Sequence, residues 1–202
     1  MKPKIAIIIL AAGASNRMGV PKQLLPWRDR TLLEHSIRIA TPIFEDVFVV
    51  LGANAKLIEQ QTTLNVPILK HENWKNGLGS SIAFAVKELK HHHFDGILFV
   101  LGDQPFVTGR YLKTLQHTFQ QESQSIIASQ FRKKLGVPAI FPQKYFNLLE
   151  ELNADEGAKQ IIKENEDNVI AIPAGDFVMD IDTKQDYEKA HKLFFGEGGK
   201  MT

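Results

Sequence analysis

The sequence predicts an α/β fold built around a mixed, mostly parallel sheet. Short apolar runs rich in β-branched residues alternate with longer amphipathic stretches, which is typical of parallel strands joined by crossover helices. The strongest runs are apolar at nearly every position, as expected for strands covered by helices on both faces. A length of 202 residues with 44% hydrophobic residues suits one such domain and is short for two. We therefore expect a single domain over residues 1–195 and a flexible tail over 196–202.

The expected elements can be placed in chain order. The central strands are Ile5–Leu10, Val47–Leu51 and Ile97–Leu101. Weaker strands, where flanking Pro and Gly indicate edges or antiparallel additions, are Val66–Leu69, Ser125–Ser129, Pro138–Phe141, Val169–Ile172 and Phe177–Asp180. Helical patterns occupy Thr31–Ala40, Asn54–Gln61, Ser80–His91, Gly109–Gln121, Gln143–Glu151, Glu156–Glu164 and Lys184–Phe194. Thr108 and Thr183 are candidate N-caps for two of them.

Composition excludes several classes of function. The 24 Lys and Arg residues nearly balance the 23 Asp and Glu residues, and no block of like charge could form a broad nucleic-acid footprint. The absence of cysteine excludes disulfides, thiolate metal sites and thiol nucleophiles. No segment approaches the roughly 18 apolar residues that a membrane helix needs. We expect a cytoplasmic protein with neither a membrane nor a nucleic-acid partner.

Two segments resemble functional signals that we interpret otherwise. Lys2 and Lys4 precede the apolar run Ile5–Ala12, as in a short signal peptide, but cleavage near Ala12 would remove the expected central strand. We therefore interpret this run as a buried strand. The three histidines at 91–93 would point about 100° apart on a helix and could not converge on one metal ion, so we assign them no role.

The loop after the first strand carries the most informative motif. It reads Leu-Ala-Ala-Gly-Ala-Ser-Asn-Arg-Met-Gly from Leu10 to Gly19 and continues as Pro-Lys-Gln-Leu-Leu-Pro. Small residues at such a sheet edge let the backbone N–H groups approach phosphate oxygens. Arg17 and Lys22 add two cations that can neutralise a triphosphate. The alternative is an ordinary turn with two surface cations. The Walker and dinucleotide-binding patterns are both missing.

Two carboxylates are candidate ligands of Mg2+. Asp103, in Gly-Asp-Gln-Pro, follows the third strong strand and should emerge at the same sheet edge as the loop. Asp182 and Asp180 share one face of a late extended segment by their spacing of two, and Asp182 is preferred. Mg2+ usually takes one or two carboxylates and completes its shell with water and phosphates. The alternatives are a polar turn for Asp103 and a helix cap for Asp182.

The loop motif resembles the signature of the molybdenum-cofactor nucleotidyltransferases, within the wider class of activated-sugar and isoprenoid pyrophosphorylase-type enzymes. The resemblance spans roughly residues 5–190. It implies a Rossmann-like three-layer sandwich of the nucleotide-diphospho-sugar transferase type. It also implies catalytic roles for Arg17, Lys22 and Asp103, and Mg2+ held by Asp103 and Asp182. The nucleotide contacts that it implies are Leu10, Ala11, Ala12, Gly13, Ala14, Ser15, Arg17, Lys22, Gly77, Gly79, Ser80 and Ser81.

The segment containing these last four residues, Asn73 to Ser81, resembles the Gly-x-x-x-Ser element that contacts the base in that family. A turn with an N-cap is the alternative. Two further segments resemble the family's acceptor pocket, with Ala154 in place of a common Gly and Lys159 in place of a common Arg, which loses a bidentate fork. The acceptor contacts that they imply are Gly136, Pro138, Asp155, Gly157 and Lys159.

The resemblance implies transfer of CMP from CTP to molybdopterin with release of pyrophosphate. CTP is favoured because Leu-Ala-Ala-Gly resembles the cytidylyl branch, whereas the guanylyl branch typically has Leu-Ala-Gly-Gly, so the preference depends on Ala12. The alternatives are a GTP-dependent molybdopterin guanylyltransferase and a sugar- or alditol-phosphate nucleotidyltransferase. A third is a noncatalytic chaperone that carries molybdopterin to a molybdenum hydroxylase, against which the intact charged residues argue.

Overall fold

The computed structural model describes residues 2–153, 157–175 and 179–196. Its main sheet has seven strands in the order β5-β4-β1-β6-β8-β7-β9. These strands are β1 (Ile5–Ala11), β4 (Asp46–Leu51), β5 (Ile68–Lys70), β6 (Gly96–Leu101), β7 (Ile126–Phe131), β8 (Lys134–Pro142) and β9 (Val169–Pro173). Only β8 runs antiparallel to its neighbours, β6 and β7. The sheet is therefore mixed and mostly parallel, as the sequence predicts.

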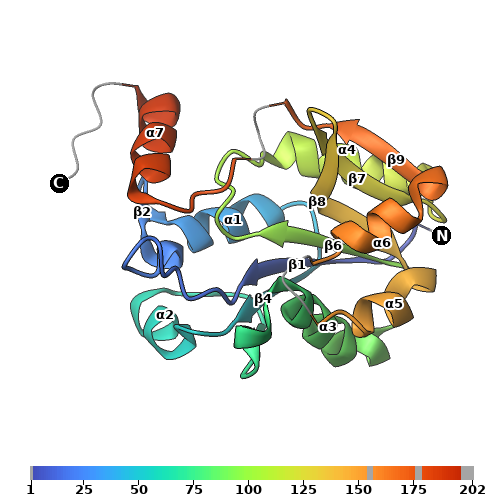
Figure 1. Ribbon diagram of the computed structural model, residues 1–202, viewed down its shortest axis with the longest axis horizontal. Coiled ribbons are helices and arrows are strands. Elements are labelled where there is room, and N and C mark those ends of the chain that lie inside the picture. The colour runs from blue at the N-terminus through green and yellow to red at the C-terminus, as the bar shows by residue number, and fades with distance from the viewer. Residues whose placement is uncertain (1, 154–156, 176–178, 197–202) are drawn as a thin grey trace.

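Helices cover both faces of this sheet (Figure 1). They are α1 (Leu32–Ala40), α2 (Ala55–Gln61), α3 (Leu78–Leu89), α4 (Gly109–Gln121), α5 (Phe146–Glu150), α6 (Lys159–Glu164) and α7 (Lys184–Phe195). Odd-numbered residues of β1, such as Ile7, pack with α1, α2 and α4, whereas even-numbered ones, such as Ile8, pack with α3, α5 and α6. The alternation of side chains along a strand thus divides the core into two layers. The result is the expected three-layer sandwich.

A third, smaller apolar cluster joins the two ends of the chain. A short hairpin of β2 (Pro26–Trp27) and β3 (Arg30–Thr31) carries Trp27, which is fully buried. Phe194 and Phe195 of α7 pack on this ring, with centroids 5.2 Å away in each case. Figure 1 shows α7 beside β2, at one side of the main sheet. The last helix therefore packs against the segment that follows the first loop.

Local signals placed the starts of α4 and α7 correctly. The hydroxyls of Thr108 and Thr183 accept hydrogen bonds from the backbone N–H groups of Tyr111 and Asp186, so both predicted caps are confirmed. Thr183 also forms a capping box with Asp186. Among the described residues, no helix is long and apolar enough to cross a membrane.

Some boundaries differ from the prediction. The strand expected at 138–141 is antiparallel as expected, but it belongs to β8 and lies inside the sheet. The helix expected at 143–151 opens as a 3-10 turn, and the helix expected from Ser80 begins two residues earlier at Leu78. Of the strand expected at 177–180, Phe177 and Val178 lie outside the described residues, and Met179 and Asp180 belong to no strand. The described part of the helix expected at 156–164 begins at Lys159.

Candidate active site

A cavity of about 530 Å3 opens at the edge of the sheet where β1 and β6 end. This volume lies in the range of about 300–1,000 Å3 that small-molecule sites occupy. The two strands pair in parallel register up to Leu10 and Leu101, so the loops that follow them emerge together. The described residues lining the cavity are 10–17, 22–23, 74–75, 77–78, 81, 101–103, 180 and 182. The predicted phosphate loop, base segment and metal ligands all contribute to this one cavity.

The loop after β1 is folded by a residue that the motif did not mark. Gln23 is only 3% exposed. Its amide donates hydrogen bonds to the carbonyl oxygens of Ala11 (2.7 Å) and Gly13 (3.1 Å). Ser15, at φ 58°, accepts a hydrogen bond on its hydroxyl from the backbone N–H of Lys22 (3.0 Å). The loop therefore closes on itself and directs the Lys22 side chain toward the end of β6.

Lys22 joins the two predicted metal ligands. Its ammonium group donates to the Asp103 carboxylate and to Oδ1 of Asp182, the latter at 3.0 Å. Arg17 donates to Oδ2 of Asp182 at 2.9 Å, from a side chain that is 70% exposed. We call these four residues, Arg17, Lys22, Asp103 and Asp182, the charged wall of the cavity. The sequence placed all four at one sheet edge, and the structure brings their charged groups into contact.

Burial shapes the ionisation of the central pair. Burial raises the pKa of the Asp103 carboxyl, although the neighbouring Lys22 ammonium opposes this shift. For Lys22, burial alone would lower the pKa, but the carboxylates of Asp103 and Asp182 outweigh it and leave the pKa raised. Lys22 is therefore charged, and its ammonium group favours the ionised form of the carboxylate beside it. The negative charge on Asp103 depends on a cation beside it.

Asp182 lies near Asp103 because hydrogen bonds join the segment 180–182 to the segment 103–104. The backbone N–H of Ile181 donates to the Asp103 carbonyl at 3.0 Å. The side chain of Gln104, which is 3% exposed, donates to Oδ1 of Asp180 at 2.7 Å. Asp180 thus orients the segment, while Asp182 faces Lys22. Thr183, not Asp182, caps α7, and Thr108 caps α4, so neither predicted ligand is used as a helix cap.

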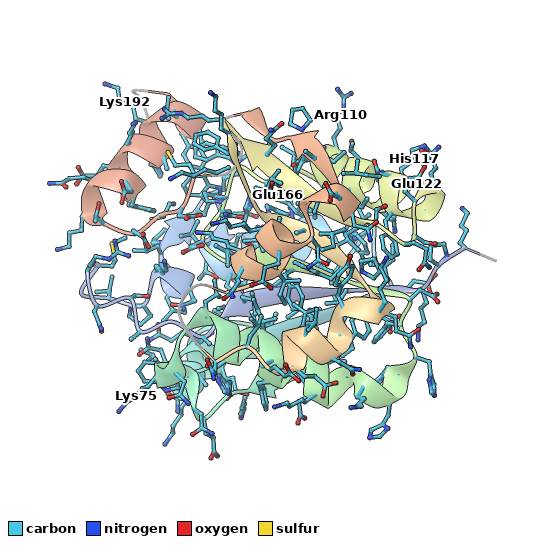
Figure 2. The ribbon with its side chains drawn as sticks, turned by 45° about the vertical axis from the view of Figure 1, so that its right-hand side comes forward. Lys75, Arg110, His117, Glu122, Glu166 and Lys192 are labelled. Atoms are coloured by element: carbon cyan, nitrogen blue, oxygen red, sulfur yellow. The ribbon has the colours of Figure 1, made fainter. Side chains whose placement is uncertain are left out.

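The opposite side of the cavity carries few charges. It is formed by Trp74, Gly77, Leu78 and Ser81, which we call the neutral wall. Lys75, in the same segment, also lines the cavity, and Figure 2 labels it at the periphery of the molecule. The predicted contacts Gly79 and Ser80 do not line the cavity; both are buried in the first turn of α3. Because consecutive helical residues point about 100° apart, Leu78 and Ser81 share the face toward the cavity and the two residues between them do not.

The predicted acceptor residues gather near this wall without lining the cavity. Gly136 and Pro138 lie on β8, and Lys159 begins α6 with its Cε 4.0 Å from where a Cβ on Gly136 would lie. Gly157 approaches the side chain of Leu78 from outside. Asp155 lies outside the described residues. The structure therefore groups three of these four described positions, Gly136, Pro138 and Lys159, on β8 and α6, and Gly157 beside Leu78.

Comparison with known proteins shows the family of this chain. Residues 7–169 match the family described as the MobA-like NTP transferase domain. The chain belongs to this family. The MobA-like match begins at Ile7 within β1, includes the loop after it, the neutral wall and Asp103, and ends before Asp182.

Proteins similar to this chain carry names that describe different activities. A probable molybdenum cofactor guanylyltransferase of Bacillus mycoides is 24% identical over 94% of this chain and 96% of its own length. The nicotine blue oxidoreductase of Paenarthrobacter nicotinovorans is 37% identical over 51% of each chain. The Mycobacterium tuberculosis protein Rv0371C, solved in complex with manganese, superposes with a TM-score of 0.80 at 26% identity, over 94% of this chain and 98% of its own.

The MobA-like chain has groups that fit a divalent cation. Asp103 Oδ1 is buried and has no hydrogen-bond partner among the described residues. Asp103 and Asp182 both line the cavity and already share one cation, the Lys22 ammonium. No group of three or more His, Asp or Glu side chains suited to a metal occurs in the described part of the chain. Two carboxylates with room for phosphate oxygens match the preference of Mg2+ or Mn2+.

Proposed function

We propose that this protein is a Mg2+-dependent nucleotidyltransferase that moves CMP from CTP to molybdopterin and releases pyrophosphate. One observation carries the proposal. The Lys22 ammonium reaches both Asp103 and Asp182 inside a cavity that is also lined by the loop after β1. One triphosphate laid along that loop can therefore meet a buried cation and two carboxylates together. Family membership supports nucleotidyl transfer, and the chain's own geometry supports the site.

The proposed reaction needs no protein nucleophile. A terminal phosphate oxygen of the acceptor attacks the α-phosphorus of the nucleotide, forming a new P–O–P link. The bond from the α-phosphorus to the bridging oxygen breaks, and the electron pair leaves with pyrophosphate. A phosphate monoester is already anionic at neutral pH, so positioning and neutralisation of charge can carry the rate.

Each residue then has a stated task. Backbone N–H groups of residues 11–15 bind the triphosphate, and Lys22 and Arg17 neutralise the charge that grows on the leaving pyrophosphate. Asp103 and Asp182 hold the divalent ion, which supplies further positive charge to the phosphates. Lys22 and Arg17 already pair with these carboxylates and have further N–H donors that can reach a phosphate.

The choice of nucleotide rests on Ala12. This residue lines the cavity, and its resemblance to the cytidylyl branch supports CTP. The name of the Bacillus mycoides relative supports GTP, so a guanylyltransferase is the second candidate. The name of the Paenarthrobacter nicotinovorans relative suggests an oxidoreductase as a further candidate. The absence of the dinucleotide-binding pattern from the sequence argues against it. These candidates require different nucleotides and are separable by one assay.

The acceptor is proposed to bind beside the neutral wall. Gly136, Pro138, Asp155, Gly157 and Lys159 are the proposed contacts, and a molybdenum hydroxylase is the proposed recipient of the product. A sugar or alditol phosphate is the alternative acceptor. A noncatalytic molybdopterin chaperone is the alternative outside enzymes, and it predicts tight pterin binding without turnover.

The decisive experiment is a panel assay. The protein is mixed with each of CTP, GTP, ATP and UTP, with and without molybdopterin, and pyrophosphate release is measured with Mg2+ supplied and then chelated. We expect release only with CTP, molybdopterin and Mg2+ together. Release with GTP alone of the four would make the protein a guanylyltransferase. Release with sugar or alditol phosphates but not molybdopterin would replace the acceptor, and oxidation of NADH or NADPH without pyrophosphate release would overturn the proposal.

A further inference from the structure

Two buried side chains hold the neutral wall without reaching the cavity. His71 directly follows β5 and is 6% exposed, and Ser80 lies in the first turn of α3 and is 9% exposed. Neither lines the cavity; both line a separate hollow that also borders Asn73 and Phe84. His71 and Ser80 can therefore influence the position of the neutral wall, but they do not contact a ligand inside the cavity.

The two side chains form a hydrogen-bonded chain to the backbone of the wall. Ser80 Oγ donates to the Gly77 carbonyl at 2.8 Å and lies 3.0 Å from Nε2 of His71. A serine hydroxyl has a single hydrogen, and a carbonyl oxygen can only accept. With the Ser80 hydrogen on Gly77, the shorter of its two carbonyl contacts (the Asn73 carbonyl oxygen lies 3.5 Å away), Nε2 of His71 is assigned as the donor to Ser80. The chain runs from His71 through Ser80 to Gly77.

His71 is itself firmly anchored to the sheet. Its backbone N–H donates to the Leu51 carbonyl at the end of β4, at 2.8 Å. Its ring stacks on Phe84 of α3, with centroids 4.8 Å apart and planes inclined by 21°. Burial lowers the pKa of the His71 imidazole, so the ring is neutral near pH 7. The hydrogen-bonded chain thus connects a rigid strand end to the wall.

Gly77 is the position at which this connection acts. It has φ 93° and ψ −175°, a backbone conformation that favours glycine, and it lies between the 3-10 turn Trp74–Asn76 and α3, at the cap position of both. Its N–H donates to the Trp74 carbonyl at 3.2 Å. The orientation of the Gly77 peptide therefore decides how Trp74 and Leu78, on either side of it, face the cavity.

We propose that His71 and Ser80 are positioning residues that fix the neutral wall for the nucleoside part of the nucleotide, and leave the phosphate part unaffected. The division follows from the chemistry of the two walls. Ring, aliphatic and hydroxyl groups of the neutral wall suit a base and ribose, whereas the charged wall suits phosphates. This inference rests on the proposed nucleotide site, and it adds that two buried residues outside the cavity support the segment that resembles the family's base-contacting element.

The test compares a nucleotide with the same phosphates lacking a nucleoside. Ser80→Ala removes the donor to Gly77, and His71→Phe keeps a ring on Phe84 but removes the donor to Ser80. Isothermal titration with Mg2+ measures the Kd for CTP, for GTP and for inorganic triphosphate. A lost buried hydrogen bond should raise the Kd for the bound nucleotide about 3- to 10-fold. The Kd for inorganic triphosphate should stay within error of the wild-type value.

Two further variants sharpen the result. The double variant Ser80→Ala with His71→Phe should weaken nucleotide binding no more than the stronger single variant, because both cut one chain. Ser36→Ala is a matched control, since Ser36 Oγ also donates to a backbone carbonyl from within a helix, that of Leu32 at 3.2 Å, but does not line the cavity. It should leave every Kd unchanged. Thermal unfolding identifies any variant that fails to fold, and Ser80→Ala alone then suffices.

The outcomes separate this inference from the proposed function. If the wild type binds CTP or GTP and the variants bind them equally well, the positioning role is wrong and the proposed function stands. An equal rise in the Kd for nucleotide and for inorganic triphosphate also overturns the positioning role, because the two residues would then affect the whole site and not its nucleoside end. If the wild type binds no nucleoside triphosphate, the proposed function fails, and the inference fails with it.

Discussion

The charged and neutral walls face one cavity but are built in opposite ways. The charged wall joins residues as many as 165 positions apart through ion pairs between side chains, and its ends come from the first loop and from the segment before α7. The residues of the neutral wall come from one segment, 74–81 at the start of α3, which also contributes Lys75 to the cavity and is held by hydrogen bonds within the range 71–81 and by packing against the sheet.

The difference separates two tasks. Under the proposed function the charged wall carries the chemistry, because a preorganised charge beside the reacting phosphates is not restored by a neutral side chain. The neutral wall positions its groups through backbone geometry, and weakening its support shifts them without removing them. We therefore expect substitutions in the charged wall to have the larger effects, and the following predictions test that order.

The largest effect is expected at Lys22 and Asp103. Lys22→Ala and Asp103→Asn should each lower kcat/KM for pyrophosphate release by about 100- to 1,000-fold, because each removes a preorganised charge beside the reacting phosphates. Steady-state kinetics on folded variants measures this loss. Lys90→Ala is the matched control, since Lys90 also forms an ion pair, with Glu150 at 3.3 Å, but does not line the cavity. Near-normal activity in both site variants would contradict the assignment of the charged wall.

Asp182 should show its effect most directly in metal binding. Asp182→Asn should weaken Mn2+ binding in the presence of nucleotide at least 10-fold, since loss of a ligand costs no less than loss of an outer-shell partner, which typically costs about 10- to 100-fold. Electron paramagnetic resonance of free Mn2+ measures the affinity. Asp46→Asn, at a surface ion pair with Lys4, should bind Mn2+ as the wild type does. An unchanged affinity in Asp182→Asn would leave Asp103 as the sole protein ligand of the metal.

A smaller effect is expected where the loop meets the neutral wall. Gly52 lies between Ala12 and Trp74, and a Cβ there would come within 2.6 Å of the Trp74 Cβ and 2.9 Å of the Ala12 Cβ. Ala12→Gly should therefore loosen this contact and shift the CTP-to-GTP preference toward GTP by about 10-fold, the discrimination that one methyl group typically provides. Competition between the two nucleotides measures the ratio. An unchanged ratio would place nucleotide selection elsewhere.

The smallest effect concerns stability and pH. Burial lowers the pKa of His71 below its ordinary value of 6.5, so the unfolded state binds more protons as pH falls below that value. The free energy of unfolding should therefore decrease from pH 7 toward pH 5.5, by at most about 1.4 kcal/mol per pH unit from this group. His71→Phe should reduce the slope measured in urea unfolding. Burial lowers the pKa of His35 likewise, so part of the slope should remain.

The outcome of sequence reasoning differed between the two walls. The loop motif and Gly-Asp-Gln-Pro each follow a strongly apolar strand, so local pattern sufficed to place Lys22 and Asp103 at one sheet edge. In the neutral wall, residue type suggested four contacts, but helical geometry turns Gly79 and Ser80 away from the cavity. Gln23 and Gln104 were missed because buried glutamines that bind backbone or carboxylate oxygens leave no signal of spacing or type.

The sequence by itself determined the α/β fold, the central strands, the helix caps and the motif that indicates a nucleotidyltransferase, because these depend on periodicity and on residues near one another in the chain. Only the tertiary structure decided that β8 enters the interior of the sheet, that Asp182 shares a cation with Asp103, and that His71 supports Gly77 through Ser80. These features depend on which distant segments pack together, and packing is set by the whole core rather than by any one segment.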